Sequence, residues 1–184
     1  MDMTLVAILL VLLLVVYVII QYNRLVRLNI QVDEALSQIE VQLKRRSDLI
    51  PNLVETVKGY ASHEREALES VVKARAASTS ASTLPAIAAA DGALTNALRG
   101  LLAVAEAYPD LKASTNFLQL QEELATTENK VSFSRQFYNE TVRSLNTAVK
   151  TIPTSFLVGL AKIGEREFYE VDDPSARNVP NVKF

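Results

Sequence analysis

The single histidine of the chain is the first residue to test for chemistry, because imidazole serves as a metal ligand and as a general base near neutral pH. It opens the stretch HEREA, residues 63–67, which begins like a zinc-protease motif. Such a motif needs a second histidine one helical turn further on, where this chain has Ala67. No glutamate stands three residues before His63 either, as a di-metal helical bundle requires. We therefore interpret His63 as a solvated or hydrogen-bonded residue near the end of a bundle, and we expect no metal site.

The other reactive residue types form no catalytic pattern. Two glutamates can act as acid and base if a cleft raises the pKa of one of them, but a narrow helical bundle rarely offers such a cleft. The five glycines are scattered and form no phosphate-binding loop. The chain has no cysteine, so thiolate metal sites and cysteine nucleophiles are excluded. We expect no catalytic residue, no cofactor and no enzymatic activity.

Polar residues gather instead in two stretches beside apolar helical positions, RRSDLIPNLVETVKGYASHE (45–64) and ENKVSFSRQFYN (128–139). In an antiparallel bundle these stretches face one another, and buried polar groups need partners because unpaired ones are costly. We interpret them as a structural polar seam beside Pro51, with a ligand site as the alternative. Its members are Arg46, Asp48, Asn52, Glu64, Glu128, Asn129, Arg135 and Asn139.

The elements that must hold these residues are helices. Apolar residues recur at gaps of three and four over 25–74, 84–107 and 117–152, and no run alternates as a strand would. The phase survives Pro51, which favours a kink within a continuing helix over a turn. The small polar residues at 76–83 predict the first reversal. The predicted fold is all-α: an elongated antiparallel bundle of three long helices, one with a proline kink, and a short helix within 154–163.

An apolar N-terminal segment predicts a membrane anchor. Residues 3–20 carry no charge, and a helix of this length reaches about 27 Å, close to the roughly 30 Å of a hydrocarbon core. The alternative, a cleaved signal peptide, favours a basic start and a small-residue cleavage site. We expect a transmembrane anchor at 1–22, a helical bundle at 23–163 and a C-terminal tail at 164–184.

The residues flanking this segment predict how it meets the lipid. Tyr17 and Tyr22 lie near one end, where aromatic rings favour the headgroup level, and Arg24 and Arg27 are the expected contacts to lipid headgroups. No lysine or arginine precedes the span, so the positive-inside bias places the bundle of this single-pass cell-membrane protein in the cytoplasm. The formal net charge of -2 argues against nucleic acid as a partner.

The motifs resemble those of the LemA family of bacteria. The resemblance covers almost everything from Tyr22 to Phe184, and RRSDLIPNLV and TENKVSFSRQFYN are its most specific stretches. These motifs include Pro51 and Tyr138, which complete the polar seam. Leu36 and Leu145 stand where the family usually has aromatic residues. The resemblance implies a long helical bundle with an N-terminal membrane helix and no established enzymatic activity. It also links the chain to relatives that shape intracellular membranes and to genes that neighbour membrane metalloproteases.

These observations predict a membrane-anchored structural or scaffolding protein that self-associates as a homo-oligomer and organises or shapes the membrane. The alternative is a regulatory adaptor of a membrane-associated protease or other membrane enzyme. It would use the acidic tail 165–173 with Phe168 and Tyr169 as anchors, unless that tail is disordered or folded along the bundle. The apolar segment 156–163 is too short to span a membrane, and it needs cover from its own bundle, from a neighbour or from the lipid interface.

Overall fold

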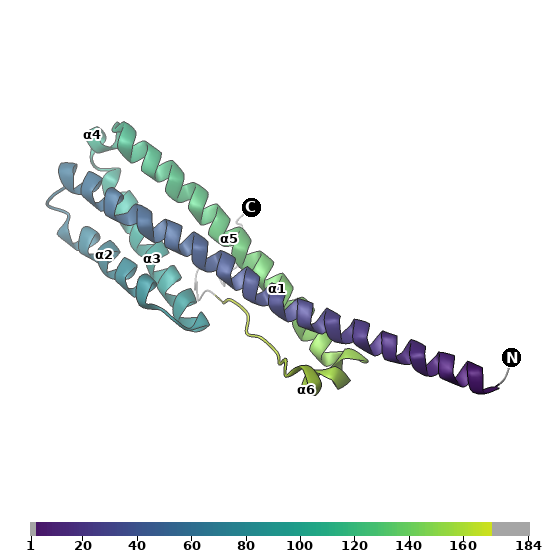
Figure 1. Ribbon diagram of the computed structural model, residues 1–184. Helices are drawn as coiled ribbons and strands as arrows, with labels where there is room; N and C mark the ends of the chain where they lie inside the picture. Colours follow the sequence, from purple (N-terminus) through teal and green to yellow (C-terminus); the bar gives the residue numbers. More distant parts are fainter. Residues whose placement is uncertain (1–2, 171–184) are drawn as a thin grey trace, which may run out of the picture. The chain divides into compact units, whose positions relative to one another are not determined.

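The computed structural model describes residues 3–170, and within that range the chain is helical without strands (Figure 1). The predicted all-α class with a long apolar N-terminal helix is confirmed. The elements in chain order are α1 (Met3–Tyr60), α2 (Arg65–Ser80), α3 (Leu84–Ala105), α4 (Pro109–Lys112), α5 (Thr115–Lys150), the 3-10 helix η1 (Thr154–Leu157) and α6 (Val158–Ala161).

Helix α1 is one uninterrupted helix of 58 residues that contains Pro51. The prediction that the helix continues through this proline is therefore confirmed. The prediction of a single helix over 25–74 is wrong, because α1 ends at Tyr60 and a turn at 61–64 leads into α2. The apolar spacing hid this turn because Ala61 and Leu68, on its two sides, are both buried in one core. Within residues 3–170 there are accordingly four long helices, α1, α2, α3 and α5, where three were predicted.

The described chain divides into two compact units. The first consists of residues 3–38 and 134–168, and the second of residues 39–133 and 169–170. Both α1 and α5 therefore contribute one part of their length to each unit. The division predicted from the sequence, at residues 22 and 163, follows other boundaries and stays a prediction.

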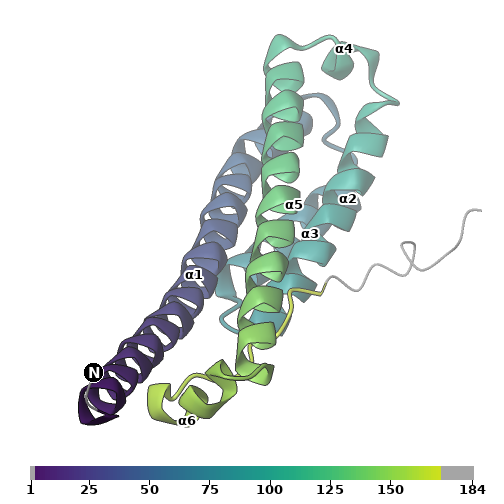
Figure 2. The same ribbon diagram turned by 90° about the vertical axis from the view of Figure 1, so that its right-hand side faces the viewer.

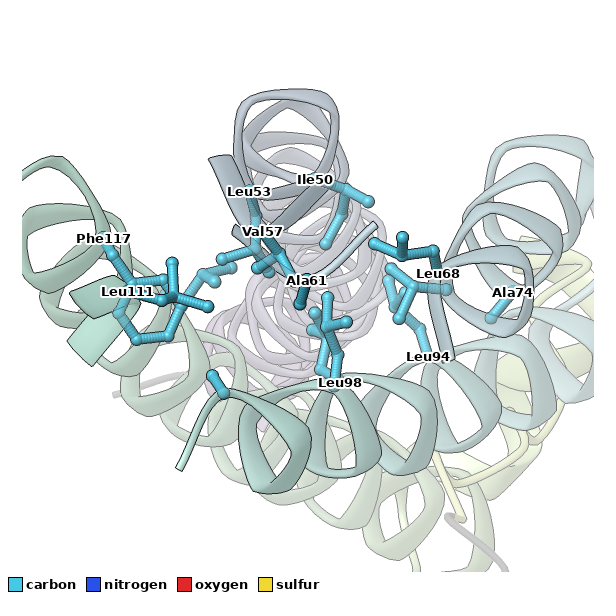
Figure 3. Close-up of a cluster of buried hydrophobic side chains, with 14 residues drawn as sticks. Ile50, Leu53, Val57, Ala61, Leu68, Ala74, Leu94, Leu98, Leu111 and Phe117 are labelled. Atoms are coloured by element: carbon cyan, nitrogen blue, oxygen red, sulfur yellow. The ribbon is translucent and has the colours of Figure 1, made fainter. Parts of the chain in front are cut away.

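The second unit is a bundle formed by the C-terminal part of α1, by α2 and α3, and by the N-terminal part of α5 (Figures 1 and 2). Short connections reverse the chain between successive helices, as is usual for antiparallel neighbours. Thr83 caps α3 by accepting a hydrogen bond from the amide of Ala86. The side chains of this core meet between the helices (Figure 3), and they include Ile50, Leu53, Val57, Leu68, Leu94, Leu98, Leu101, Leu111 and Phe117.

The first unit shows a sharp change of burial along α1. Residues 3–20 are almost all exposed, whereas Leu25, Val32 and Ala35 are completely buried. Both α1 and α3 are long and apolar enough to cross a membrane. For α3 this composition has another explanation, because Leu94 and Leu101 lie in the core of the second unit. Of these two helices, only α1 has an apolar segment that is left uncovered by the described residues.

Candidate functional site

The most concentrated group of buried charges lies inside the second unit and centres on Arg46 of α1. Its guanidinium lies 3.1 Å from Asp91 of α3 and 2.8 Å from Glu128 of α5. It also donates a hydrogen bond of 3.0 Å to the hydroxyl of Thr95, one turn after Asp91. The phenol of Tyr169 donates to the other oxygen of Asp91 at 2.8 Å. We call these five residues the Arg46 cluster.

Burial determines what this cluster does. The side chains of Arg46 and Asp91 are 4% and 0% exposed, whereas that of Glu128 is 37% exposed. Removing a charge from water is costly unless an opposite charge and hydrogen bonds compensate it, so Arg46 and Asp91 need each other. Because the partners come from α1, α3, α5 and the segment after α6, only one register of these elements satisfies all of them. The cluster therefore selects a register more than it adds net stability.

Apart from Glu64, the residues predicted as a polar seam fall into three groups. Arg46 and Glu128 meet in the Arg46 cluster, as their placement on facing helices predicted. Four others, Asp48, Pro51, Asn52 and Asn129, are exposed, so the expectation of buried partners is wrong for the three polar ones. They occupy helix positions that turn toward solvent, and Asp48 pairs with the equally exposed Lys44 at 3.4 Å. The third group, Arg135, Tyr138 and Asn139, belongs to the first unit.

Asp91 and Thr95 are cluster members that were not predicted from the sequence, although a signal for Asp91 was present. The apolar stripe of α3 runs from the partly buried Ile87 to the buried Leu94, Leu98 and Leu101, and Asp91 occupies the stripe position between the first two. A charged residue on an otherwise apolar helical stripe either disrupts the core or has a buried partner of opposite charge. Only the fold identifies that partner as Arg46, 45 residues earlier in the chain.

Glu64, also predicted for the seam, lies at the end of the second unit, where it accepts a hydrogen bond of 3.0 Å from the Tyr108 phenol. That hydrogen bond, then partial burial and the negative charge of Glu64, raise the pKa of Tyr108 above its ordinary value of 10.0. His63 is exposed in the adjoining turn. Because the pKa of Tyr108 is raised by folding, its contribution to stability is complete below about pH 10 and is lost as the pH rises through the folded-state value.

Replacing Glu64 with glutamine should lower the pKa of Tyr108 toward 10, because the amide still accepts the hydrogen bond but carries no charge. The measurement is a pH titration of ring-labelled tyrosine by NMR, compared between the parent protein and the variant. Glu66→Gln, an exposed change in the first turn of α2, is the control and should leave the Tyr108 titration in place. An unchanged Tyr108 titration in the Glu64 variant contradicts this explanation.

In the first unit, the segment after α6 is held by a second polar group, which we call the tail clasp. The amide side chain of Asn146 donates to the carbonyl of Arg166 and accepts from its backbone amide, each at 2.9 Å. The guanidinium of Arg166 pairs with Asp33 and donates to Asn29 at 3.4 Å. The Tyr138 phenol donates to the Glu167 carbonyl at 3.0 Å.

The tail was predicted to bind a partner, to be disordered or to fold along the bundle. The tail clasp shows that residues 165–169 are folded along the helices. Tyr169, one of the two proposed partner anchors, is buried, and only Phe168 is exposed. Burial raises the pKa of Tyr138 above its ordinary value, and the nearby Arg166 opposes this shift. The part of the proposed acidic tail at 171–173 lies outside the described residues.

Replacing Asn146 with alanine should lower the free energy of unfolding by about 1–3 kcal/mol, because two hydrogen bonds to the Arg166 backbone are lost. Chemical denaturation followed by far-ultraviolet circular dichroism measures the change. Asn129→Ala is the matched control, since Asn129 is exposed on the same helix, and it should change stability by less than about 0.5 kcal/mol. Equal effects of the two substitutions contradict a role for Asn146 in holding the tail.

One open groove bears on the alternative that the seam is a ligand site. An open groove of about 380 Å³ lies in the second unit, and Lys44, Ser47, Asp48 and Thr79 are among its lining residues. Asn52, His63 and Glu128 do not line it. Among residues 3–170, no three His, Asp or Glu side chains gather in an arrangement that could hold a metal ion. The groove thus offers polar side chains at its walls but brings none of the predicted seam together apart from Asp48.

An uncovered apolar helix joined to an all-helical bundle is typical of membrane-associated helical proteins. The chain belongs to the LemA family, whose pattern matches residues 35–184. The resemblance noted from the motifs is thereby confirmed.

Two named groups of relatives support this assignment. Protein LemA of Metamycoplasma hominis is 26% identical over 165 residues, which cover 85% of this chain and 75% of the relative. Magnetosome protein MamQ 2 of Paramagnetospirillum magneticum is 23% identical over 176 residues, or 82% of this chain and 65% of that protein. Magnetosome protein MamQ of Magnetospirillum gryphiswaldense is 22% identical over 175 residues, or 81% and 64%.

The chain thus spans slightly less than two thirds of the MamQ relatives. The names of these relatives state no enzymatic activity. Together with the uncovered apolar helix, the relatives are consistent with a membrane location.

Proposed function

We propose that the protein is a membrane-anchored scaffold that self-associates at the membrane and organises it, without catalysing a reaction. The observation that carries the proposal is α1, in which the uncovered apolar residues 3–20 continue without interruption into the first helix of the bundle. Anchor and bundle are thus parts of one helix. In this proposal Tyr17, Tyr22, Arg24 and Arg27 meet the lipid headgroups, and the bundle lies on the cytoplasmic side.

The composition of the buried sites supports a structural role over a catalytic one. The Arg46 cluster joins a cation to two carboxylates, a threonine and a tyrosine, and each group serves another member of the cluster. Such a set, in which each polar group is paired with another member, stabilises one arrangement of helices. The names of the MamQ relatives place them at the magnetosome, and an organising role at a membrane is the function we extend to this chain.

Self-association needs a surface, and the second unit exposes apolar side chains that its own core does not use. Phe133 of α5 is 70% exposed, and Val41, Val72 and Leu118 are also exposed. Exposed aromatic residues are common anchors of protein interfaces, where a few residues carry most of the binding energy. We therefore place Phe133 in the contact between copies.

Replacing Phe133 with aspartate should weaken self-association by about tenfold or more, because an interface anchor contributes roughly 2 kcal/mol or more. Sedimentation velocity of the full chain in mild detergent, over a range of concentrations, measures the shift from assembly to the 20.3 kDa monomer. Gln136→Asp, at an exposed site one turn along α5, is the control for added charge. A parent protein that sediments as a monomer at every concentration contradicts the scaffold proposal itself.

The adaptor alternative is weakened by the position of Tyr169, whose phenol is committed to Asp91. Phe168 stays exposed and is the remaining anchor of that proposal. Co-purification with a membrane protease that is lost in Phe168→Ala, while sedimentation stays unchanged, is the result that favours an adaptor over a scaffold.

A further inference from the structure

A second apolar surface lies in the first unit, outside the anchor. Ile152, Phe156 and Leu160 are 76%, 77% and 71% exposed, which is as much as the uncovered residues of α1. The opposite side of the same segment is buried, because Thr154 and Ile163 pack against the unit. The Thr154 hydroxyl also donates hydrogen bonds to the carbonyls of Ala148 and Thr151. The segment is therefore fixed with one apolar side facing out. We call its three exposed residues the Phe156 face.

The way α1 and α5 pair within this unit shows which residues of α1 lie beside the Phe156 face. Residues 31–38 of α1 and 137–144 of α5 line one shallow groove, so these two stretches lie side by side. Further along α5, Asn146 is hydrogen-bonded to the backbone of Arg166. The guanidinium of Arg166 in turn contacts Asn29 and Asp33 of α1. The helices are thus antiparallel, and α5 ends at Lys150 roughly level with residues 25–27 of α1. Figures 1 and 2 show α6 directly after the C-terminal end of α5.

The burial of α1 residues independently places the Phe156 face near residue 25 of α1. Leu25 is completely buried, whereas Ile20 is half exposed, so cover of α1 begins between them. That boundary is where the uncovered apolar segment ends, and in a membrane it is where hydrocarbon gives way to headgroups. The Phe156 face follows Lys150 directly in the chain and therefore lies at this boundary.

We propose that the Phe156 face inserts into the interface of the bilayer that holds the anchor, as a second and shallower lipid contact. Apolar side chains on one side of a short, fixed segment insert to a depth of about 5–10 Å when cations lie nearby. Arg24 and Arg27 at the end of the apolar segment and the exposed Lys162 supply such cations. The carboxylate of Glu165 is already paired with Lys150 at 2.8 Å.

Lipid fits this face better than a protein partner does. The uncovered part of α1 and the Phe156 face meet at one level, so a bilayer around the first also reaches the second. Insertion would also tie the unit to the membrane at two points and would limit rotation about the anchor. The inference rests on the membrane anchoring proposed above, and it does not depend on self-association.

The test uses the absence of cysteine from the chain, which makes every introduced thiol unique. Single variants Phe156→Cys and Leu160→Cys of the full protein receive a polarity-sensitive fluorophore and are reconstituted into vesicles of phosphatidylcholine and phosphatidylglycerol. Vesicles brominated on the acyl chain near the headgroup serve as quenchers. Leu12→Cys reports insertion of the anchor. Val41→Cys is the matched control, because Val41 is an apolar residue of α1 that is 61% exposed and lies in the second unit, outside the apolar segment.

We expect the fluorophores at residues 156 and 160 to show blue-shifted emission that the brominated lipid quenches. The emission of the fluorophore at residue 41 should stay unchanged. Unquenched emission at residues 156 and 160 with quenching at residue 12 overturns the inference and leaves the anchor in place. If residue 12 is also unquenched, both the anchor and the inference fail. Equal quenching at residues 41 and 156 would mean that the Phe156 face is no closer to the lipid than residue 41, and it would overturn the inference. Rapid disulfide formation between copies through residue 156, without quenching, identifies a second copy as the occupant and also overturns the inference.

Discussion

Replacement of Arg46 with methionine is expected to lower the free energy of unfolding by about 3–5 kcal/mol, the range for breaking a buried ion pair on one side. The substitution keeps a long, flexible side chain in place, so little packing is lost. It leaves the carboxylate of Asp91, which is 0% exposed, without the cation at 3.1 Å. Glu128 loses the same cation but remains partly solvated, so Asp91 accounts for most of the cost.

Denaturation of the full protein in detergent, followed by far-ultraviolet circular dichroism, measures this loss. Lys44→Met is the matched control, because Lys44 lies two residues earlier on α1 and its partner Asp48 is also exposed. Exposed pairs contribute about 0–1 kcal/mol, so this control should change stability little. If the two methionine variants have similar effects, the Arg46 cluster is not a buried ionic network.

A double variant separates an unpaired charge from lost packing. Arg46→Met combined with Asp91→Leu removes both partners, and an apolar pair of similar size is often as stable as a buried ion pair. We expect the double variant to regain a large part of the stability that Arg46→Met loses. A double variant that is less stable than the single one would show that the register depends on the polar partners Thr95 and Tyr169 instead.

Two arginines in the apolar segment should remove the protein from the membrane. At the centre of a spanning helix, each arginine disfavours insertion by about 2.5–3.5 kcal/mol. Leu9→Arg and Leu12→Arg both lie near the middle of residues 3–20, where both leucines are exposed. The double variant is therefore expected to lose roughly 5–7 kcal/mol of insertion free energy, provided the two costs add.

The measurement is the fraction of protein that stays with membranes after an alkaline carbonate wash. Val41→Arg with Val72→Arg adds the same charge at exposed apolar sites of the second unit, and this control should remain with the membranes. Retention of the Leu9 and Leu12 variant in the membrane fraction at the level of the control would mean that residues 3–20 do not anchor the chain.

The sequence was sufficient for the features that depend on local periodicity. Apolar gaps of three and four define one side of a helix, so the all-α class, the continuity of α1 through Pro51 and the full length of α5 were predictable. The uncharged run at 3–20 likewise specified an apolar helix, because its composition alone decides its preference for lipid. The turn at 61–64 was not predictable. Ala61 and Leu68 lie on its two sides and both pack into one core, so the helical spacing of apolar residues continues across the turn.

The candidate site depended on tertiary structure. Arg46 and Glu128 were predicted to face one another, but Asp91 completes the cluster from another helix and Tyr169 from a position 78 residues further along. A local pattern tells which residues of a helix are buried, but the partner of a buried charge is chosen by the packing of distant segments. The same reason explains why Asp48, Asn52 and Asn129 looked like seam residues and are exposed. Periodicity assigns sides to each helix, and only the packed bundle decides which sides meet, because burial must pair each charge with its counter-charge.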